Sequence, residues 1–134
     1  MNLPEQLRLL GIFHYIVGGM HALFGCIGIF HLVIGIIFMV NPQAFDGPSQ
    51  DAPPMWFGAL FAAVGGSIIL FGWTVGFLTI LSGRFIARRV HRTYSIVMGG
   101  INCALFPFGT VLGVFDMIIL TKDETKALYQ TAQS

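Results

Sequence analysis

The sequence predicts an all-α integral membrane protein, a helical bundle with three transmembrane spans. Charged residues make up only 10% of the chain and apolar residues 55%, whereas a soluble domain carries about 25% charged residues. Three long stretches contain a single charged residue between them: residues 9–45, 52–83 and 93–121. Each exceeds the roughly 20 residues that cross a hydrocarbon core of about 30 Å. We therefore expect three spans and a short interfacial C-terminal segment: residues 9–40, 55–83, 94–121 and 122–134.

The first expected span carries glycine or histidine along one face of the predicted helix. In alternating steps of three and four residues, this face reads Gly11, His14, Gly18, His21, Gly25, Gly28, Leu32 and Gly35. Small residues in lipid let helix backbones approach closely, although glycine costs roughly 1 kcal/mol relative to alanine in a soluble helix. The unbroken face favours one long helix of about 48 Å over residues 9–40. The alternative is a hairpin of two halves of about 16 residues, each too short to cross.

The second and third expected spans repeat this spacing of small residues. The second face reads Gly58, Ala62, Gly65, Ile69, Gly72, Gly76, Thr79 and Gly83, and the third reads Ser95, Gly99, Asn102, Phe106, Gly109, Gly113, Asp116 and Leu120. The spacing matches the 3.5-residue repeat of left-handed helix packing. We therefore expect helix packing at eight glycines: Gly18, Gly25, Gly28, Gly65, Gly72, Gly76, Gly109 and Gly113.

Pro107 lies near the middle of the third expected span. Proline removes a backbone hydrogen bond and kinks a helix, and neighbouring helices accommodate such a kink in a membrane. We therefore expect a kinked third span. The alternative is a re-entrant hairpin with residues 106–110 at its tip, lining a polar path.

The distribution of charge predicts the orientation of the helices. The link between residues 41 and 54 contains Asp46 and Asp51 and no basic residue. Four arginines lie in or beside the link between the second and third spans: Arg84, Arg88, Arg89 and Arg92. By the positive-inside rule the arginine-rich link and the N-terminus are cytoplasmic, and three full crossings place the C-terminus outside. The same arginines are expected to contact anionic lipid head groups.

Asp116 is the sharpest candidate for a functional side chain, because an ionisable group at membrane depth is costly and by default a functional hypothesis. It lies only about 8 Å along the helix from Thr121, so the alternative is a structural hydrogen bond or a carboxylate close to the surface. Thr121 and Glu124 also have capping-box spacing, which predicts a short helix at residues 122–129.

The histidines form a second group of candidates. His14 and His21 share a face about 10 Å apart along the axis, so one metal ion cannot bind both, and a haem needs histidines from two protomers. They either satisfy structural hydrogen bonds or conduct protons, since imidazole titrates near neutral pH. We hypothesise that His31 lies at the depth of Asp116 and pairs with it. The candidate polar or ion-path residues are Asp116, His31, His21, His14 and Asn102.

Four stretches carry a family resemblance. They are GIFHYIVGG at residues 11–19, IFHLVIG at 29–35, FPFGTVLGVF at 106–115 and KALY at 126–129. Together they resemble a group of small, uncharacterised bacterial multi-span inner-membrane proteins. The resemblance implies a location in the bacterial inner membrane, and it transfers no catalytic residue.

These patterns favour a non-enzymatic membrane protein that assembles through its glycine-rich faces, as a homo-oligomer or as an accessory subunit of a larger complex. The alternatives are an oligomeric ion or proton channel that uses Asp116 and the histidines, and a haem-binding electron-transfer subunit. The sequence contains no phosphate-binding loop, nucleophile elbow or zinc motif. We therefore expect no metal and no cofactor, and the lipid bilayer rather than nucleic acid as a partner.

Overall fold

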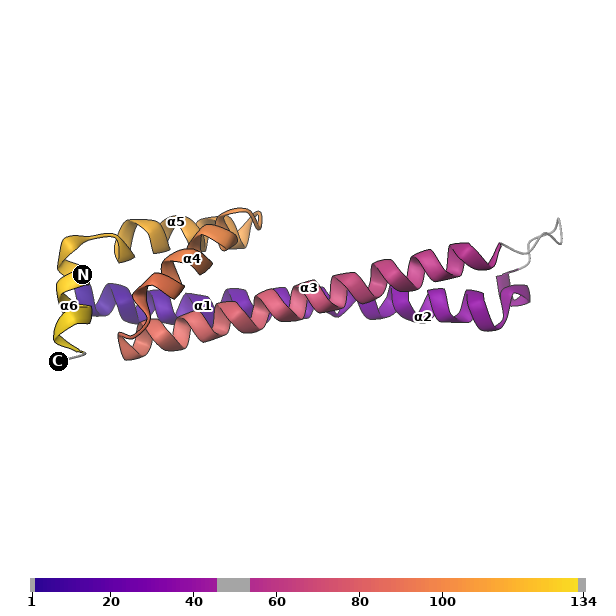
Figure 1. Cartoon of the computed structure of the whole chain (residues 1–134), viewed down its shortest axis with the longest axis horizontal. Coiled ribbons are helices and arrows are strands. Elements are labelled where there is room, and N and C mark those ends of the chain that lie inside the picture. Colours follow the sequence, from indigo (N-terminus) through magenta and orange to yellow (C-terminus); the bar gives the residue numbers. More distant parts are fainter. Residues whose placement is uncertain (1, 46–53, 133–134) are drawn as a thin grey trace. The chain divides into compact units, whose positions relative to one another are not determined.

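The computed structural model of the chain describes residues 2–45 and 54–132, and these residues form helices and no strands. The elements are α1 (Leu3–Gly25), α2 (Ile27–Val40), the 3-10 helix η1 (Pro42–Phe45), α3 (Met55–Arg88), α4 (Arg92–Cys103), α5 (Phe108–Leu120) and α6 (Asp123–Thr131) (Figure 1). The predicted all-helical class is confirmed. Asp46 and Asp51 of the predicted external link lie outside the described residues.

Two segments are long and apolar enough to cross a membrane, Leu3–Val40 and Met55–Arg88. Within the first, Cys26 is the one residue outside a helix, and its backbone keeps right-handed helical angles (φ −64°, ψ −20°). The expectation of one long helix is therefore confirmed, and the alternative of a hairpin within residues 9–40 is wrong.

The chain divides into two compact units, a larger unit of Met1–Met20 with Val75–Ser134 and a smaller unit of His21–Thr74. The smaller unit pairs the end of α1 and α2 with the first half of α3. Its glycines face each other in antiparallel order, Gly28 against Gly65 and Gly35 against Gly58. A Cβ added at Gly28 would lie 2.5 Å from the carbonyl oxygen of Gly65. The two backbones therefore touch where the small residues recur.

The larger unit packs the start of α1, the end of α3 and the three C-terminal helices around one core. The apolar cluster at this core contains Leu7, Leu10, Val17, Ile86, Leu112, Leu120 and Tyr129. Here too the glycines of α1 meet those of α3. A Cβ added at Gly18 would lie 2.8 Å from the carbonyl oxygen of Gly76, and one added at Gly11 would lie 3.3 Å from that of Gly83.

The third expected span is instead two short helices, α4 and α5, which run antiparallel (Figure 1). Their 12 and 13 residues reach about 18 and 20 Å, less than the hydrocarbon core of about 30 Å. The chain reverses before Pro107, whose peptide bond to Phe106 is cis. A single kinked helix over residues 94–121 is therefore wrong, and the predicted third transmembrane span is not confirmed. The alternative of a hairpin at Pro107 describes the fold.

Glycines allow α4 and α5 to lie close together. A Cβ at Gly109 would lie 2.7 Å from the carbonyl oxygen of Asn102, and one at Gly113 would meet Gly99 and Cys103. The hydroxyl of Thr110 donates a hydrogen bond to the carbonyl oxygen of Cys103 at 2.9 Å, which satisfies a carbonyl at the end of α4.

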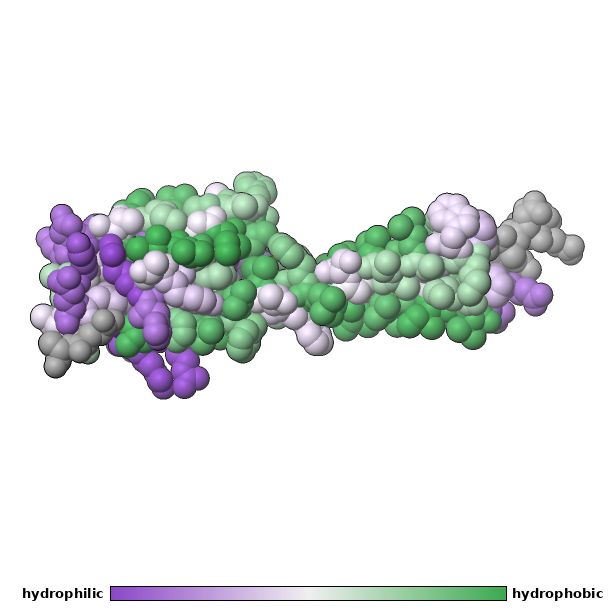
Figure 2. Space-filling model, in the orientation of Figure 1, coloured by the Kyte–Doolittle hydropathy of each residue, from purple (hydrophilic) through white to green (hydrophobic). Residues whose placement is uncertain are grey.

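The helix expected after Thr121 is present as α6. The capping box is absent, because the hydroxyl of Thr121 donates to the carbonyl oxygen of Met117 and no side chain caps α6. Lys122 Nζ donates to Gln6 Oε1 at 3.5 Å, so α6 lies at the N-terminal end of α1. Hydrophilic residues gather at this end of the larger unit, and its other visible surface is mostly apolar (Figure 2).

Candidate functional site

The larger unit has a polar interior. Polar side chains without exposed surface are, within the described ranges, His14, Thr79, Ser82, Ser95, Asn102, Asp116 and Thr125. The first six, from α1, α3, α4 and α5, are called the polar core below. Burying a polar group is costly unless it finds a partner, so the contacts of these six side chains decide what the site can do.

His14 and Asp116 form an ion pair at the centre of this interior. Nε2 of His14 lies 3.1 Å from Oδ2 of Asp116, and neither side chain is exposed. Nδ1 of His14 lies 2.9 Å from the carbonyl oxygen of Leu10. Because a carbonyl accepts only, Nδ1 carries a proton and Nε2 is the nitrogen that faces the carboxyl group. The buried carboxyl group of Asp116 therefore has the Nε2 side of the imidazole as its neighbour.

Two glycines make room for the pair. A Cβ at Gly83 of α3 would lie 2.7 Å from Cβ of His14, and one at Gly99 of α4 would lie 2.6 Å from Cβ of Asp116. The glycines thus leave space for the two polar side chains, in addition to letting the helix backbones approach each other. A larger residue at either position would push apart the helices that hold the pair.

The rest of the polar core is only partly satisfied. The hydroxyl of Thr79 donates to Oδ1 of Asn102 at 3.3 Å and joins α3 to α4. Within residues 2–45 and 54–132, six buried polar atoms of the polar core have no hydrogen-bond partner. Two of them, His14 Nε2 and Asp116 Oδ2, face each other in the ion pair, and the other four are Asn102 Nδ2, Asp116 Oδ1, Ser82 Oγ and Ser95 Oγ. The interior therefore offers both unused donors and unused acceptors, since a hydroxyl group can do either.

The predicted pairing of Asp116 with His31 is wrong. Asp116 contacts His14, whereas His31 belongs to the smaller unit, where its ring stacks on Phe61 with centroids 5.7 Å apart. The error came from treating residues 94–121 as one crossing helix. Because the chain reverses at Pro107, Asp116 packs beside the first half of α1.

The five predicted ion-path residues do not form one group. His14, Asn102 and Asp116 share the larger unit, whereas His21 and His31 belong to the smaller one. Nδ1 of His31 lies 3.3 Å from the carbonyl oxygen of Ile27. Thr79 and Ser82 were not among the candidates. Their signal was two hydroxyl residues three positions apart, on one face of an otherwise apolar helix.

The eight predicted packing glycines lie against backbone or side-chain atoms of a neighbouring helix. Gly18 meets Gly76, Gly25 meets Gly72 and Gly28 meets Gly65, while Gly109 and Gly113 meet α4. By contrast, nothing lies within 4 Å of a Cβ added at Gly19 or Gly66. The predicted glycine faces of α1, α2 and α3 therefore meet each other within a single chain.

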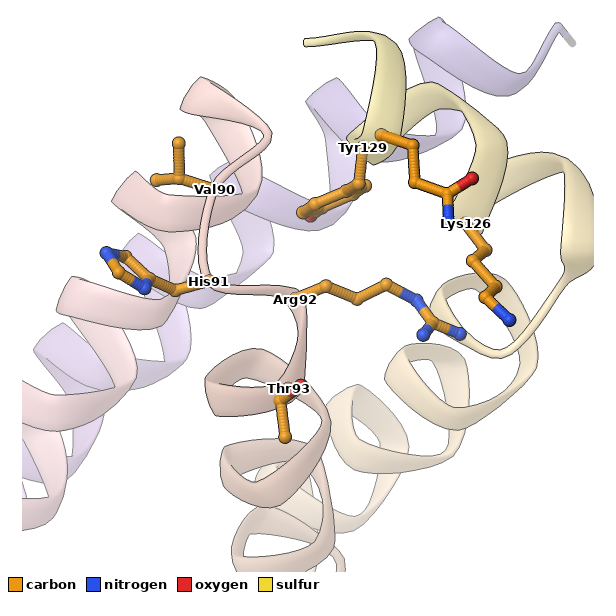
Figure 3. A pocket seen from close by; sticks show the side chains of 7 residues that line it. Val90, His91, Arg92, Thr93, Lys126 and Tyr129 are labelled. Atoms are coloured by element: carbon orange, nitrogen blue, oxygen red, sulfur yellow. The ribbon is translucent and has the colours of Figure 1, made fainter. Parts of the chain in front are cut away.

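Arg92 and Lys126 line a surface cleft at the α3–α4 turn of the larger unit (Figure 3). Arg84 and Arg88 are exposed, and Arg89 and Arg92 are half-buried. The cleft has a volume of about 470 Å³ and is lined by Val90, His91, Arg92, Thr93, Lys126, Tyr129 and Gln130. Arg92 Nε donates to the carbonyl oxygen of Leu120 at 2.7 Å, which fixes the arginine between α4 and α5.

Tyr129 closes the inner side of this cleft. Its side chain is 3% exposed, and its hydroxyl has no hydrogen-bond partner in the part of the chain that the structure describes. Burial raises the pKa of Tyr129 to about 12, so the hydroxyl keeps its proton at physiological pH. Lys126 and Tyr129 were not predicted as site residues, because they lie in a polar segment that shows no repeat.

Metal ligands are not grouped in the described residues: no three His, Cys, Asp or Glu side chains there lie close enough to hold an ion. Cys26 and Cys103 are free thiols. Comparisons of the chain with protein-family models, with curated proteins and with solved structures found no match.

Proposed function

We propose that this chain is a small non-enzymatic protein of the bacterial inner membrane that assembles with further copies of itself. In this proposal α1 with α2 crosses the bilayer once and α3 crosses it once. The α4–α5 hairpin enters from the cytoplasmic side and returns. The contact of Lys122 with Gln6 supports this topology, because it joins the C-terminal helix to the N-terminus. The arginines around the α3–α4 turn support a cytoplasmic location for that end.

One observation carries the assembly, a free face of small residues on α3 within the smaller unit. Ala59, Ala63 and Ser67 are exposed at four-residue spacing, and beside them Gly66 has open space where a Cβ would stand. Small residues at this spacing let two membrane helices approach closely. The glycines on the opposite side of α3 are already in contact with α1 and α2. The free face therefore remains available to pack against a second copy of the chain.

Two adjacent glycines provide a matched test. Gly66→Leu fills the free face and should reduce the mass of the detergent-solubilised protein to that of a monomer, with helix content unchanged. Gly65→Leu should instead loosen the single chain, because a Cβ at Gly65 would already lie 2.6 Å from the carbonyl oxygen of Gly28. A wild type that is monomeric in native mass measurements, or a Gly66→Leu variant that keeps its mass, would contradict self-assembly. A monomeric wild type would favour the role of an accessory subunit.

Proton conduction is a second candidate function, favoured by the buried pair of His14 and Asp116. A carboxyl group beside an imidazole has the chemistry of a proton relay. Conduction predicts proton flux in liposomes that Asp116→Asn abolishes. Wild-type liposomes that leak no faster than empty ones would exclude this function and leave the pair as a structural clamp.

A further inference from the structure

The cleft at the α3–α4 turn combines positive charge with unused hydrogen-bond donors. Arg92 and Lys126 both line it, and none of its lining residues in the described ranges carries a carboxylate. Neither of these cations forms an ion pair with a carboxylate within the described ranges, where the one ion pair is that of His14 with Asp116. Figure 3 shows the guanidinium of Arg92 extending towards Lys126. Two cations that approach each other without an acidic partner favour an anion between them.

The backbone adds further donors at this place. α4 begins at Arg92 within the cleft, and no side chain caps its first turn. The first amide groups of a helix lack partners inside the helix and attract anions, especially phosphate. The hydrogen bond from Nε to Leu120 holds the guanidinium in place and leaves its two terminal nitrogens for a ligand.

Tyr129 provides an independent indication of a ligand. Its side chain is almost wholly buried, yet its hydroxyl has no partner in the described part of the chain. The ring reaches from α6 towards the α3–α4 turn, beside the cleft that it lines (Figure 3). A buried hydroxyl without a partner is costly, and an acceptor in the cleft would remove that cost.

We propose that this cleft is a binding site for a phosphate group, held by Arg92, Lys126, the hydroxyl of Tyr129 and the first amides of α4. The phosphate belongs either to the head group of an anionic phospholipid or to a soluble phosphate. Both sources present the same oxygens to the same donors. The site uses none of the residues of the free face of α3. A negative result for self-assembly therefore leaves the phosphate site unaffected, and the reverse also holds.

The test uses the full-length protein in a neutral detergent. One arm adds inorganic phosphate, and the other adds phosphatidylglycerol with phosphatidylcholine as its reference. Binding is followed through the rise in melting temperature that a ligand of the folded state produces. Stabilisation by inorganic phosphate identifies a soluble phosphate as sufficient, whereas stabilisation by phosphatidylglycerol alone identifies a lipid head group.

Variants show whether the cleft itself binds. Lys126→Gln should weaken binding about tenfold or more, since a charged hydrogen bond contributes about 1.5 to 3 kcal/mol. Tyr129→Phe should weaken it severalfold, and Lys126→Arg should retain it. Arg88→Gln is the matched control, because Arg88 is exposed at the same end but does not line the cleft. Absence of stabilisation in both arms, or equal losses for Arg88→Gln and Lys126→Gln, would overturn the proposal.

Discussion

His14 of α1 and Asp116 of α5 face each other at 3.1 Å, and neither side chain has any exposed surface. This contact ties the first helix of the chain to the returning arm of the C-terminal hairpin. Because Gly83 and Gly99 lie against the two side chains, the contact also brings α3 and α4 to the same place. The ion pair thus joins four helices of the larger unit.

The pair should behave as one energetic unit. Asp116→Asn and His14→Gln should each destabilise the protein, and the double variant should be less destabilised than the sum of the two effects. We expect a coupling energy of about 0.6 to 1.7 kcal/mol, the range for polar contacts between membrane helices. Unfolding in mixed micelles measures it, and single effects that simply add would show that the two side chains do not interact.

Gly18 and Gly19 are adjacent in the sequence but should respond in opposite ways to enlargement. Gly18→Leu should destabilise the larger unit by about 1 to 3 kcal/mol, because a Cβ there would lie 2.7 Å from Cγ1 of Ile80 and 2.8 Å from the carbonyl oxygen of Gly76. Gly19→Leu should change stability by less than about 0.5 kcal/mol, since nothing lies within 4 Å of that position. Thermal unfolding of both variants in detergent makes the comparison, and equal losses would show that the predicted glycine face is not the packing surface.

Tyr129 should make stability depend on alkaline pH. The pKa of Tyr129 is raised by burial from 10.0 to about 12, so the folded state holds the proton more tightly than the unfolded state. The resulting stability is complete below pH 10 and is lost as the pH rises through about 12. The difference in stability between the wild type and Tyr129→Phe should therefore be constant below pH 10 and shift against the wild type above it. A constant difference up to pH 12 would contradict this.

The sequence predicted the two long helices correctly because their signal is local. An apolar run of sufficient length and a repeated small residue are both visible without knowledge of the fold. The third apolar run was predicted to form one helix, because hydropathy does not distinguish a chain that continues from one that turns back. The reversal before Pro107 depends on glycines of α5 that fit against α4, and such a fit between two helices is a tertiary property.

The same limit applies to the candidate site. Asp116 stood out because a carboxyl group is rare in an apolar run, and the structure buries it completely. Its partner was misassigned because a straight third span places Asp116 at the depth of His31, whereas a hairpin places it beside His14. Lys126 and Tyr129 could not be found, because only the fold brings α6 to the α3–α4 turn.

The location of the C-terminus distinguishes a returning α4–α5 hairpin from a third crossing, since the hairpin returns to the end at which the chain began. The measurement is a pair of reporters fused after residue 134 in a bacterial host, one active only in the cytoplasm and the other only outside. Insertions between residues 41 and 54 and between residues 89 and 91 serve as references for the two sides. We expect the C-terminal fusion to match the 89–91 insertion, with only the cytoplasmic reporter active. Activity of the external reporter at the C-terminus would mean that residues 92–120 cross the membrane, and it would contradict the re-entrant hairpin.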